Sequence, residues 1–169
     1  MSFLVWIESW PFCVWVRESS SVWGEPMFLF LHTVGMSMIA GVSVVIDLAL
    51  LGFWPKVSIK PLEKLYPVMW MGFWINAVTG TVLLLADATS KFPSIVFWIK
   101  MAFVFSGVWL LVVIRKKIFG RPELAQGLLP RSARGLAWAS IVCWLGAIEA
   151  GRLLAYLGPV SGLTGISNH

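Results

Sequence analysis

Four stretches of the chain are apolar over the length that a helix needs to cross a lipid bilayer. They cover residues 27–54, 67–87, 93–114 and 136–157. A transmembrane helix requires about 20 mostly apolar residues, because each residue advances the helix by about 1.5 Å and the hydrocarbon core is about 30 Å thick. The sequence therefore predicts an all-α membrane protein, built as a bundle of four transmembrane helices.

The overall composition is that of an integral membrane protein. Of the 169 residues, 59% are hydrophobic and only 12% are charged, whereas a soluble domain has about 25% charged residues. Pro67 and Pro93 stand at first-turn positions of two spans, where the missing N–H costs little, and Gly158-Pro159 should end the fourth. We expect one integral membrane domain over residues 1–169.

The N-terminal segment, residues 1–26, differs from the four spans. It contains charged residues and a proline among four tryptophans: Glu8, Pro11, Arg17, Glu18 and Glu25. It is therefore too polar and too interrupted to cross the membrane, and it lacks the basic start of a signal peptide. We expect it to form a short interfacial helix that lies along the membrane surface.

The basic residues predict how the spans are oriented. Nine of the thirteen Lys and Arg residues lie in the loops 55–66 and 115–135. Because basic loops stay in the cytoplasm, both termini should face outside, in the periplasm if the membrane is a bacterial inner membrane. Attraction of these loops to anionic lipid accounts for the net charge of +5, so no nucleic acid partner is expected.

Polar residues inside the spans are the candidates for function, because such residues are rare and costly in lipid. The chain has no nucleotide-binding loop and no HExxH, GxSxG or EF-hand motif. Cys13 and Cys143 form no metal-ligand spacing, and Cys143 lies in an apolar run, so no disulfide is expected. His32 and Asp47 share the first span but are about 22 Å apart along the helix. They must therefore serve separate sites in opposite leaflets.

His32 is the strongest candidate for a residue that binds a cofactor or a metal. A membrane histidine can ligate haem iron or copper or relay protons, and the alternative is a histidine bonded to a neighbouring helix. Haem b would use His32 alone or with Met69, Met71 or Met101. For Cu(I), Met36 offers a thioether one turn from His32. We predict a pocket in the outer half that takes a cofactor edge, a quinone head or a metal, lined by His32, Met36, Lys100, Glu149 and Arg152.

The other polar residues are predicted to be structural. Asp47 should be held by Arg115 or Lys116 of the basic loop. Glu149 and Arg152 are three residues apart and could instead pair on their own helix, and Lys100 could extend to the outer interface. Polar side chains that join helices complete this group: Asn76, Thr79 and Asp87.

Several motifs resemble an uncharacterised family of small four-span bacterial inner-membrane proteins. They are "WPFCVWVRESSSVW", "LHTVGMSMIAGVSVVIDLALLG", "TGTVLLLADA", "FWIKMAF" and "WLGAIEAGRLLAYLG". The resemblance covers nearly the whole chain in order, and the layout is loosely similar to the membrane domain of copper-resistance D proteins. It supports the four-span architecture and implies no activity. Its motifs match His32, Gly35, Asp47, Leu51, Gly52, Thr79, Gly80, Lys100, Gly151 and Arg152.

Three classes of function follow from these observations. The first two are a redox-associated subunit that binds haem b or quinone, and an accessory or anchor subunit of a larger membrane complex. The alternative is a protein that handles copper or transports a small solute. Because the loops are too short to form a soluble catalytic site, we expect a non-catalytic or electron-transfer subunit rather than a stand-alone enzyme. Its expected partners are the lipid bilayer and other membrane protein subunits.

Overall fold

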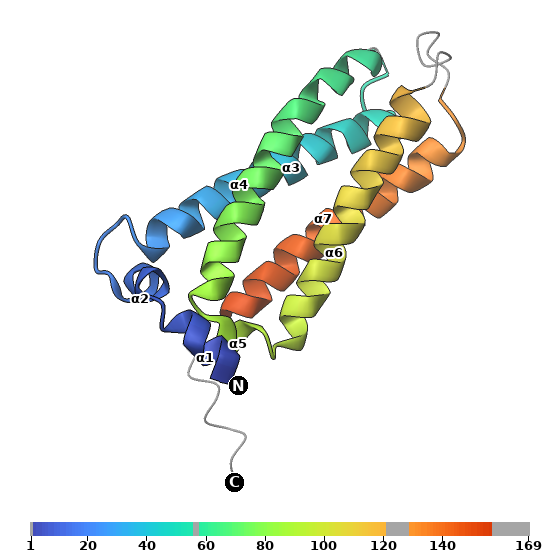
Figure 1. Cartoon of the computed structure of the whole chain (residues 1–169). Coiled ribbons are helices and arrows are strands. Elements are labelled where there is room, and N and C mark those ends of the chain that lie inside the picture. The colour runs from blue at the N-terminus through green and yellow to red at the C-terminus, as the bar shows by residue number, and fades with distance from the viewer. Residues whose placement is uncertain (1, 56–57, 121–128, 157–169) are drawn as a thin grey trace.

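The computed structural model of the chain describes residues 2–55, 58–120 and 129–156, and these residues contain helices and no β-strand. Four long helices run side by side in the bundle (Figure 1). They are α3 (Glu25–Leu51), α4 (Tyr66–Leu85), α6 (Ile95–Ile114) and α7 (Ser132–Tyr156). All four are long and apolar enough to cross a membrane. The predicted all-helical fold, with four helices of membrane-spanning length and composition, is therefore confirmed.

The first span ends earlier than its hydropathy predicts. Helix α3 stops at Leu51 and not near residue 54, because Gly52 adopts a left-handed conformation with φ of 91°. The Phe53 N–H then donates to the Leu48 carbonyl at 3.1 Å, which closes the helix as glycine typically does after a last turn. At the other end, Pro26 occupies the first turn of α3, where proline has no hydrogen bond to lose.

The two basic segments are more helical than the sequence predicts. A short 3₁₀ helix, η1 (Lys60–Leu65), precedes α4, and a wide π turn, η2 (Arg115–Phe119), continues α6. Helix α7 begins at Ser132, four residues before the predicted span, since a helix can continue into polar sequence beyond the apolar run. Residues 56–57 and 121–128 of the two predicted loops lie outside the described residues.

The long helices pack as two pairs. Helix α4 packs on α3 and α6 packs on α7, and contacts between α3 and α7 join the pairs. The buried residues at this junction come from all four helices and include Ile46, Leu50, Met69, Leu111, Ile114 and Trp144. The α3–α4 pair is especially close: a Cβ on Gly72 would lie 2.8 Å from the Gly35 carbonyl oxygen. Small residues at such crossings let two backbones approach each other.

The N-terminal segment forms two short helices, α1 (Ser2–Glu8) and α2 (Pro11–Glu18), which are too short to span. They lie at one end of the bundle together with the small helix α5 (Ala88–Lys91) and the C-terminal end of α7 (Figure 1). The Glu8 carboxylate accepts hydrogen bonds from the Thr89 N–H at 2.6 Å and the Thr89 hydroxyl at 2.8 Å. Glu8 thereby caps the start of α5 and anchors α1 to the bundle.

Helix α2 is anchored at the same end of the molecule. Cys13 and Val16 are buried, while Trp10, Phe12 and Trp15 are about half exposed. Arg17 donates to the Ala86 carbonyl at 3.2 Å and to Glu18 at 3.0 Å. The hydrogen bond to Glu18 raises the pKa of the Arg17 guanidinium further above its usual value. Arg17 therefore keeps its positive charge here at any physiological pH.

The bundle is electrically asymmetric. The basic residues of η1 and η2, together with Arg131 and Arg134, belong to the segments at the end opposite to α1, α2 and α5 (Figure 1).

The C-terminal tail from residue 157 lies outside the described residues. Cys13 and Cys143 are both free thiols, so the prediction that they form no disulfide is confirmed.

Candidate functional site

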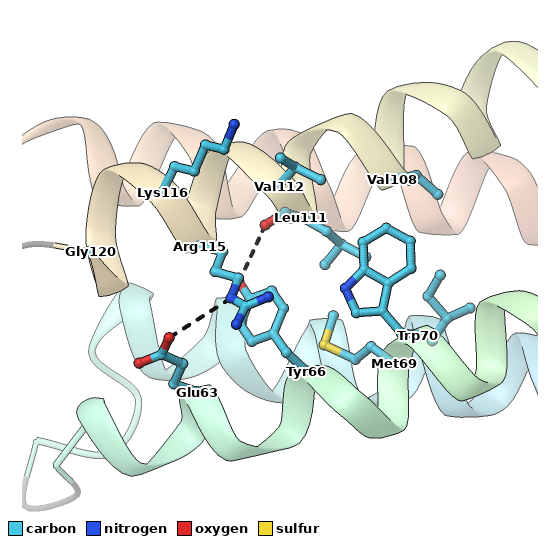
Figure 2. A pocket seen from close by; sticks show the side chains of 11 residues that line it. Glu63, Tyr66, Met69, Trp70, Val108, Leu111, Val112, Arg115, Lys116 and Gly120 are labelled. Carbon is cyan, nitrogen blue, oxygen red and sulfur yellow. Dashed lines mark hydrogen bonds and ion pairs between the residues drawn. The ribbon is translucent and has the colours of Figure 1, made fainter.

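A groove with a volume of about 380 Å³ lies between α4 and α6. We call it the α4–α6 groove. Its wall comes from α3, η1, α4, α6 and η2, and eleven residues line it: Ile39, Glu63, Tyr66, Met69, Trp70, Val108, Leu111, Val112, Arg115, Lys116 and Gly120. Figure 2 shows these side chains. Cavities of this size accept small molecules.

The polar end of the groove is formed by Tyr66, Arg115 and Glu63. The Arg115 guanidinium lies over the Tyr66 ring, 5.3 Å from its centre, a distance at which a cation is attracted to an aromatic face. Arg115 Nε also lies 3.8 Å from the Glu63 carboxylate. The Tyr66 hydroxyl donates to the Leu111 carbonyl at 3.3 Å, and this contact bridges α4 and α6. These contacts hold the guanidinium at the mouth of the groove (Figure 2).

The other end of the groove is apolar, with one polar atom available. Met69 is buried and Trp70 is half-buried, and both line the groove together with Val108 (Figure 2). Within the described part of the chain, the Trp70 Nε1–H donates to no acceptor, although the indole of Trp144 does. The groove therefore offers unused N–H donors, which suits a ligand with hydrogen-bond acceptors and an apolar body.

Local structure explains why Arg115 lies here. It is the first residue of η2, where the chain widens from an α-helix to a π turn. Such turns are rare and often occur at functional sites. From the sequence, Arg115 is expected only as a partner for Asp47, and Tyr66 and Trp70 are not among the predicted site residues. The sequence does place an aromatic residue near each basic segment. This pattern does not point to a binding site, because aromatic residues are common at any membrane interface.

His32 does not line this groove, and it contacts α4 instead. Its Nδ1 lies 3.1 Å from the Asn76 carbonyl oxygen and 3.2 Å from the Thr79 hydroxyl. In return, the Asn76 side-chain amide donates to the His32 carbonyl at 2.9 Å. The ring also lies against Gly80, where an added Cβ would be 2.8 Å from His32 Cε1. These contacts match the alternative in which the histidine joins two helices. They also show Asn76 and Thr79 in the structural role predicted for them.

Of the remaining residues of the predicted His32 pocket, Lys100 lies within electrostatic range of the His32 ring, whereas the other three lie in different surroundings. Met36 is half-buried against the central core. The Lys100 side chain lies against Gly151 of α7, where an added Cβ would be 3.7 Å from Lys100 Nζ. Glu149 and Arg152 are exposed on the outside of α7. None of these four residues, nor His32, is among the residues that line the α4–α6 groove.

The predicted ion pairs of the spans differ from those observed. Among the described residues, Glu149 and Arg152 form no ion pair with each other, and Arg115 pairs with Glu63 and not with Asp47. Asp47 is fully buried on α3 and is surrounded by hydroxyl groups. The prediction that Arg115 or Lys116 holds Asp47 is therefore wrong, because those side chains stay at the bundle end where solvent and Glu63 are available.

The hydroxyl network around Asp47 joins α3 to α7. The Ser43 hydroxyl lies 3.4 Å from Asp47 Oδ2 and 3.2 Å from the Ser140 hydroxyl. It also accepts a hydrogen bond from the Trp144 indole at 3.0 Å. Asp47 Oδ1 has no hydrogen-bond partner among the described residues. This network lies in the bundle core. Asp47 therefore has a structural role, as predicted, but its partners are serines of the core and not basic residues of the loop.

Asp87 lies at the end of the bundle and not within a span. It forms an ion pair with Lys91, four residues later, at 3.6 Å.

In the described residues, no three His, Cys, Asp or Glu side chains come together as a metal site would require.

Comparisons with protein-family models, curated proteins and solved structures find no match to this chain. The resemblance to small four-span inner-membrane proteins therefore stays an expectation from the sequence. A functional assignment must be argued from the geometry of the bundle itself.

Proposed function

We propose that this chain is a small accessory subunit of a larger membrane complex and that it binds a quinone in the α4–α6 groove. The observation that carries the proposal is the groove itself, an apolar cavity of about 380 Å³ with a guanidinium at its mouth. A bound quinone would supply two-electron redox chemistry to the complex. The residues of this chain would bind and orient the quinone head.

The hydrogen-bond donors of the groove suit the chemistry of a quinone. A quinone has two carbonyl oxygens that only accept hydrogen bonds, and it carries an apolar isoprenoid tail. Arg115 can donate at the mouth and the Trp70 indole can donate further in, while Met69 and Val108 form an apolar wall. Since the groove opens between two membrane helices, the tail can remain in lipid. Ligand sites between helices of a bundle are common.

Quinone is favoured over haem b because the histidine that the sequence offers as a haem ligand does not line the groove. Haem iron needs an axial ligand such as His, Met, Cys or Tyr. Met69 and Tyr66 line the groove but His32 does not, and the His32 ring is packed between α3 and α4. The quinone would therefore bind between α4 and α6, and His32 would serve to join α3 to α4.

Photolabelling tests the quinone proposal. A benzoquinone with a photoreactive isoprenoid tail should label peptides of α4 and α6 in the purified protein, and excess unlabelled quinone should suppress the labelling. Arg115→Gln and Trp70→Phe should each reduce it severalfold. Trp109→Phe is the matched control, because Trp109 is 65% exposed on α6 and does not line the groove.

Three results would contradict the quinone proposal. The first is labelling spread evenly over all four helices, which indicates partition into lipid. The second is suppression by anionic phospholipid vesicles but not by quinone, which assigns the groove to a lipid headgroup. The third is a sharp visible band in the reduced protein, which identifies haem b as the redox group.

Copper handling remains the alternative function, with small-solute transport in the same class, and one observation favours copper. If His32 Nδ1 carries the proton and donates to the Asn76 carbonyl, then Nε2 is the unprotonated nitrogen that a metal needs. Ligating histidines typically have such a backbone contact, and Met36 is one turn away. Metal analysis of the purified protein with and without added Cu(I) tests this alternative, with His32→Ala as the control.

We further propose that the protein resides in a bacterial inner membrane with both termini in the periplasm. The basic segments at one end of the bundle support this orientation, and the exposed aromatic residues of α1 and α2 at the other end suit a membrane interface. Helices α1 and α2 would then lie in the outer interface. With Cys13 and Cys143 replaced by alanine, an impermeant thiol reagent should label Ser167→Cys but not Ser132→Cys in intact cells. The opposite pattern would reverse the orientation.

A further inference from the structure

The outward face of α7 carries two charged side chains at membrane depth. Six exposed residues follow one another at spacings of three and four: Trp138, Val142, Leu145, Glu149, Arg152 and Tyr156. We call them the α7 stripe. The pattern repeats every seven residues, which is the spacing of a seam between two packed helices. The opposite face of α7 packs on α3 and α6, so the stripe is unpartnered within the described chain.

Charge distinguishes this stripe from an ordinary lipid-facing surface. Glu149 is seven residues before the end of α7, or about 10 Å along the helix axis. Within the described residues neither Glu149 nor Arg152 forms an ion pair. Charged side chains in spans usually face the bundle interior or pair with one another, because lipid solvates them poorly. An exposed acid and an exposed base on one face therefore require partners outside the bundle.

We infer that the α7 stripe binds the α7 stripe of a second copy of this chain. The face is self-complementary, because it presents one anion and one cation three residues apart. All copies share one orientation in the membrane, so two α7 helices related by a twofold axis run parallel. In that arrangement Glu149 faces the same residue of the other copy, and Arg152 of that copy is three residues further, about 4.5 Å along the axis, so the long arginine side chain can reach the carboxylate across the seam. One interface then contains two ion pairs and matches the symmetry of most protein dimers.

The rest of the stripe is compatible with a helix–helix seam. Val142 and Leu145 are 57% and 55% exposed and would pack against their counterparts in the middle of the interface. The inference does not depend on the quinone, because the α7 stripe shares no residue with the α4–α6 groove.

Disulfide cross-linking tests the dimer in membranes. In a chain whose Cys13 and Cys143 are replaced by alanine, Leu145→Cys should form a cross-linked dimer on mild oxidation. Val78→Cys is the matched control, because Val78 is 59% exposed on α4, and it should stay monomeric. Equal cross-linking at the two positions, or none at Leu145→Cys, would overturn the inference and indicate that the stripe faces lipid.

Charge exchange tests the ion pairs directly. A copy with Glu149→Arg presents two cations, and a copy with Arg152→Glu presents two anions, so each variant alone should lose most of its Leu145→Cys cross-linking. Co-expression of the two variants with different tags should restore a mixed dimer, in which each cation again meets an anion. Ion pairs within one copy cannot produce this rescue. Failure of co-expression to exceed the single variants, when both are inserted, would contradict the pairing.

Discussion

The imidazole ring of His32 lies directly against Gly80 of the neighbouring helix, at a position where a Cβ would come within 2.8 Å of His32 Cε1. The ring reaches this place because residue 80 has no side chain. It is held there by Asn76, whose carbonyl oxygen lies 3.1 Å from His32 Nδ1 and whose side chain donates to the His32 carbonyl. The α3–α4 contact is thus specified by a glycine and a reciprocal pair of hydrogen bonds.

Gly80→Ala should destabilise the protein by about 1–3 kcal/mol, because the methyl group forces the histidine ring away from Asn76. Combined with His32→Ala, the same change should cost much less, since no ring remains to be displaced. Unfolding in detergent measures both effects as a double-mutant cycle. If the two changes are additive, the His32 ring does not rest on Gly80.

Gly72→Ala should destabilise the protein at least as strongly. A Cβ at this position would lie 2.8 Å from the Gly35 carbonyl oxygen and 2.6 Å from Met38 Cβ, so the two helices must separate. Gly41→Ala in α3 is the matched control, because nothing lies within 4 Å of its Cβ position. It should leave stability unchanged or raise it by up to about 1 kcal/mol. Equal melting temperatures for the two variants would rule out this helix crossing.

Asp47 and Arg115 should act independently. The double-mutant cycle of Asp47→Asn and Arg115→Gln should be additive within about 0.5 kcal/mol, because the two residues form no ion pair. Asp47→Asn and Ser43→Ala should instead be coupled, since their side chains are joined at 3.4 Å. Denaturation in detergent gives the four free energies of unfolding needed for each cycle, those of the parent, the two single variants and the double variant. Strong coupling between Asp47 and Arg115 would restore the ion pair that the sequence predicted.

Glu8→Ala should release α1 from the bundle. The change removes the only carboxylate that caps α5 among the described residues, and loss of a helix cap typically costs about 1 kcal/mol. Amide hydrogen exchange should accelerate severalfold in α1 and α5 and remain unchanged in α4. Glu18→Ala is the control, because Glu18 is exposed and its one hydrogen-bond partner among the described residues is Arg17. Unchanged exchange in α1 would show that other contacts anchor this helix.

The sequence by itself determined the number and type of the long elements. Four apolar runs of membrane-spanning length can only be satisfied as helices, because each helix pairs its own backbone groups without help from its neighbours. Hydropathy is a sum over adjacent residues, so it needs no knowledge of the rest of the chain. The same holds for the separation of the N-terminal segment from the spans, since Pro11 and the charges around it act locally.

Only the tertiary structure decided which faces of these helices meet. The spans carry apolar residues on every side, so hydropathy does not mark an inner face as it does in a soluble helix. Ser43, for example, finds its partner Ser140 ninety-seven residues away. The α4–α6 groove likewise exists only because α4 packs on α3 while α6 packs on α7. Each helix forms from residues that are adjacent in the sequence. Which helices pack together depends on close approach at glycines and on buried hydrogen bonds, and these contacts form only once the helices have assembled.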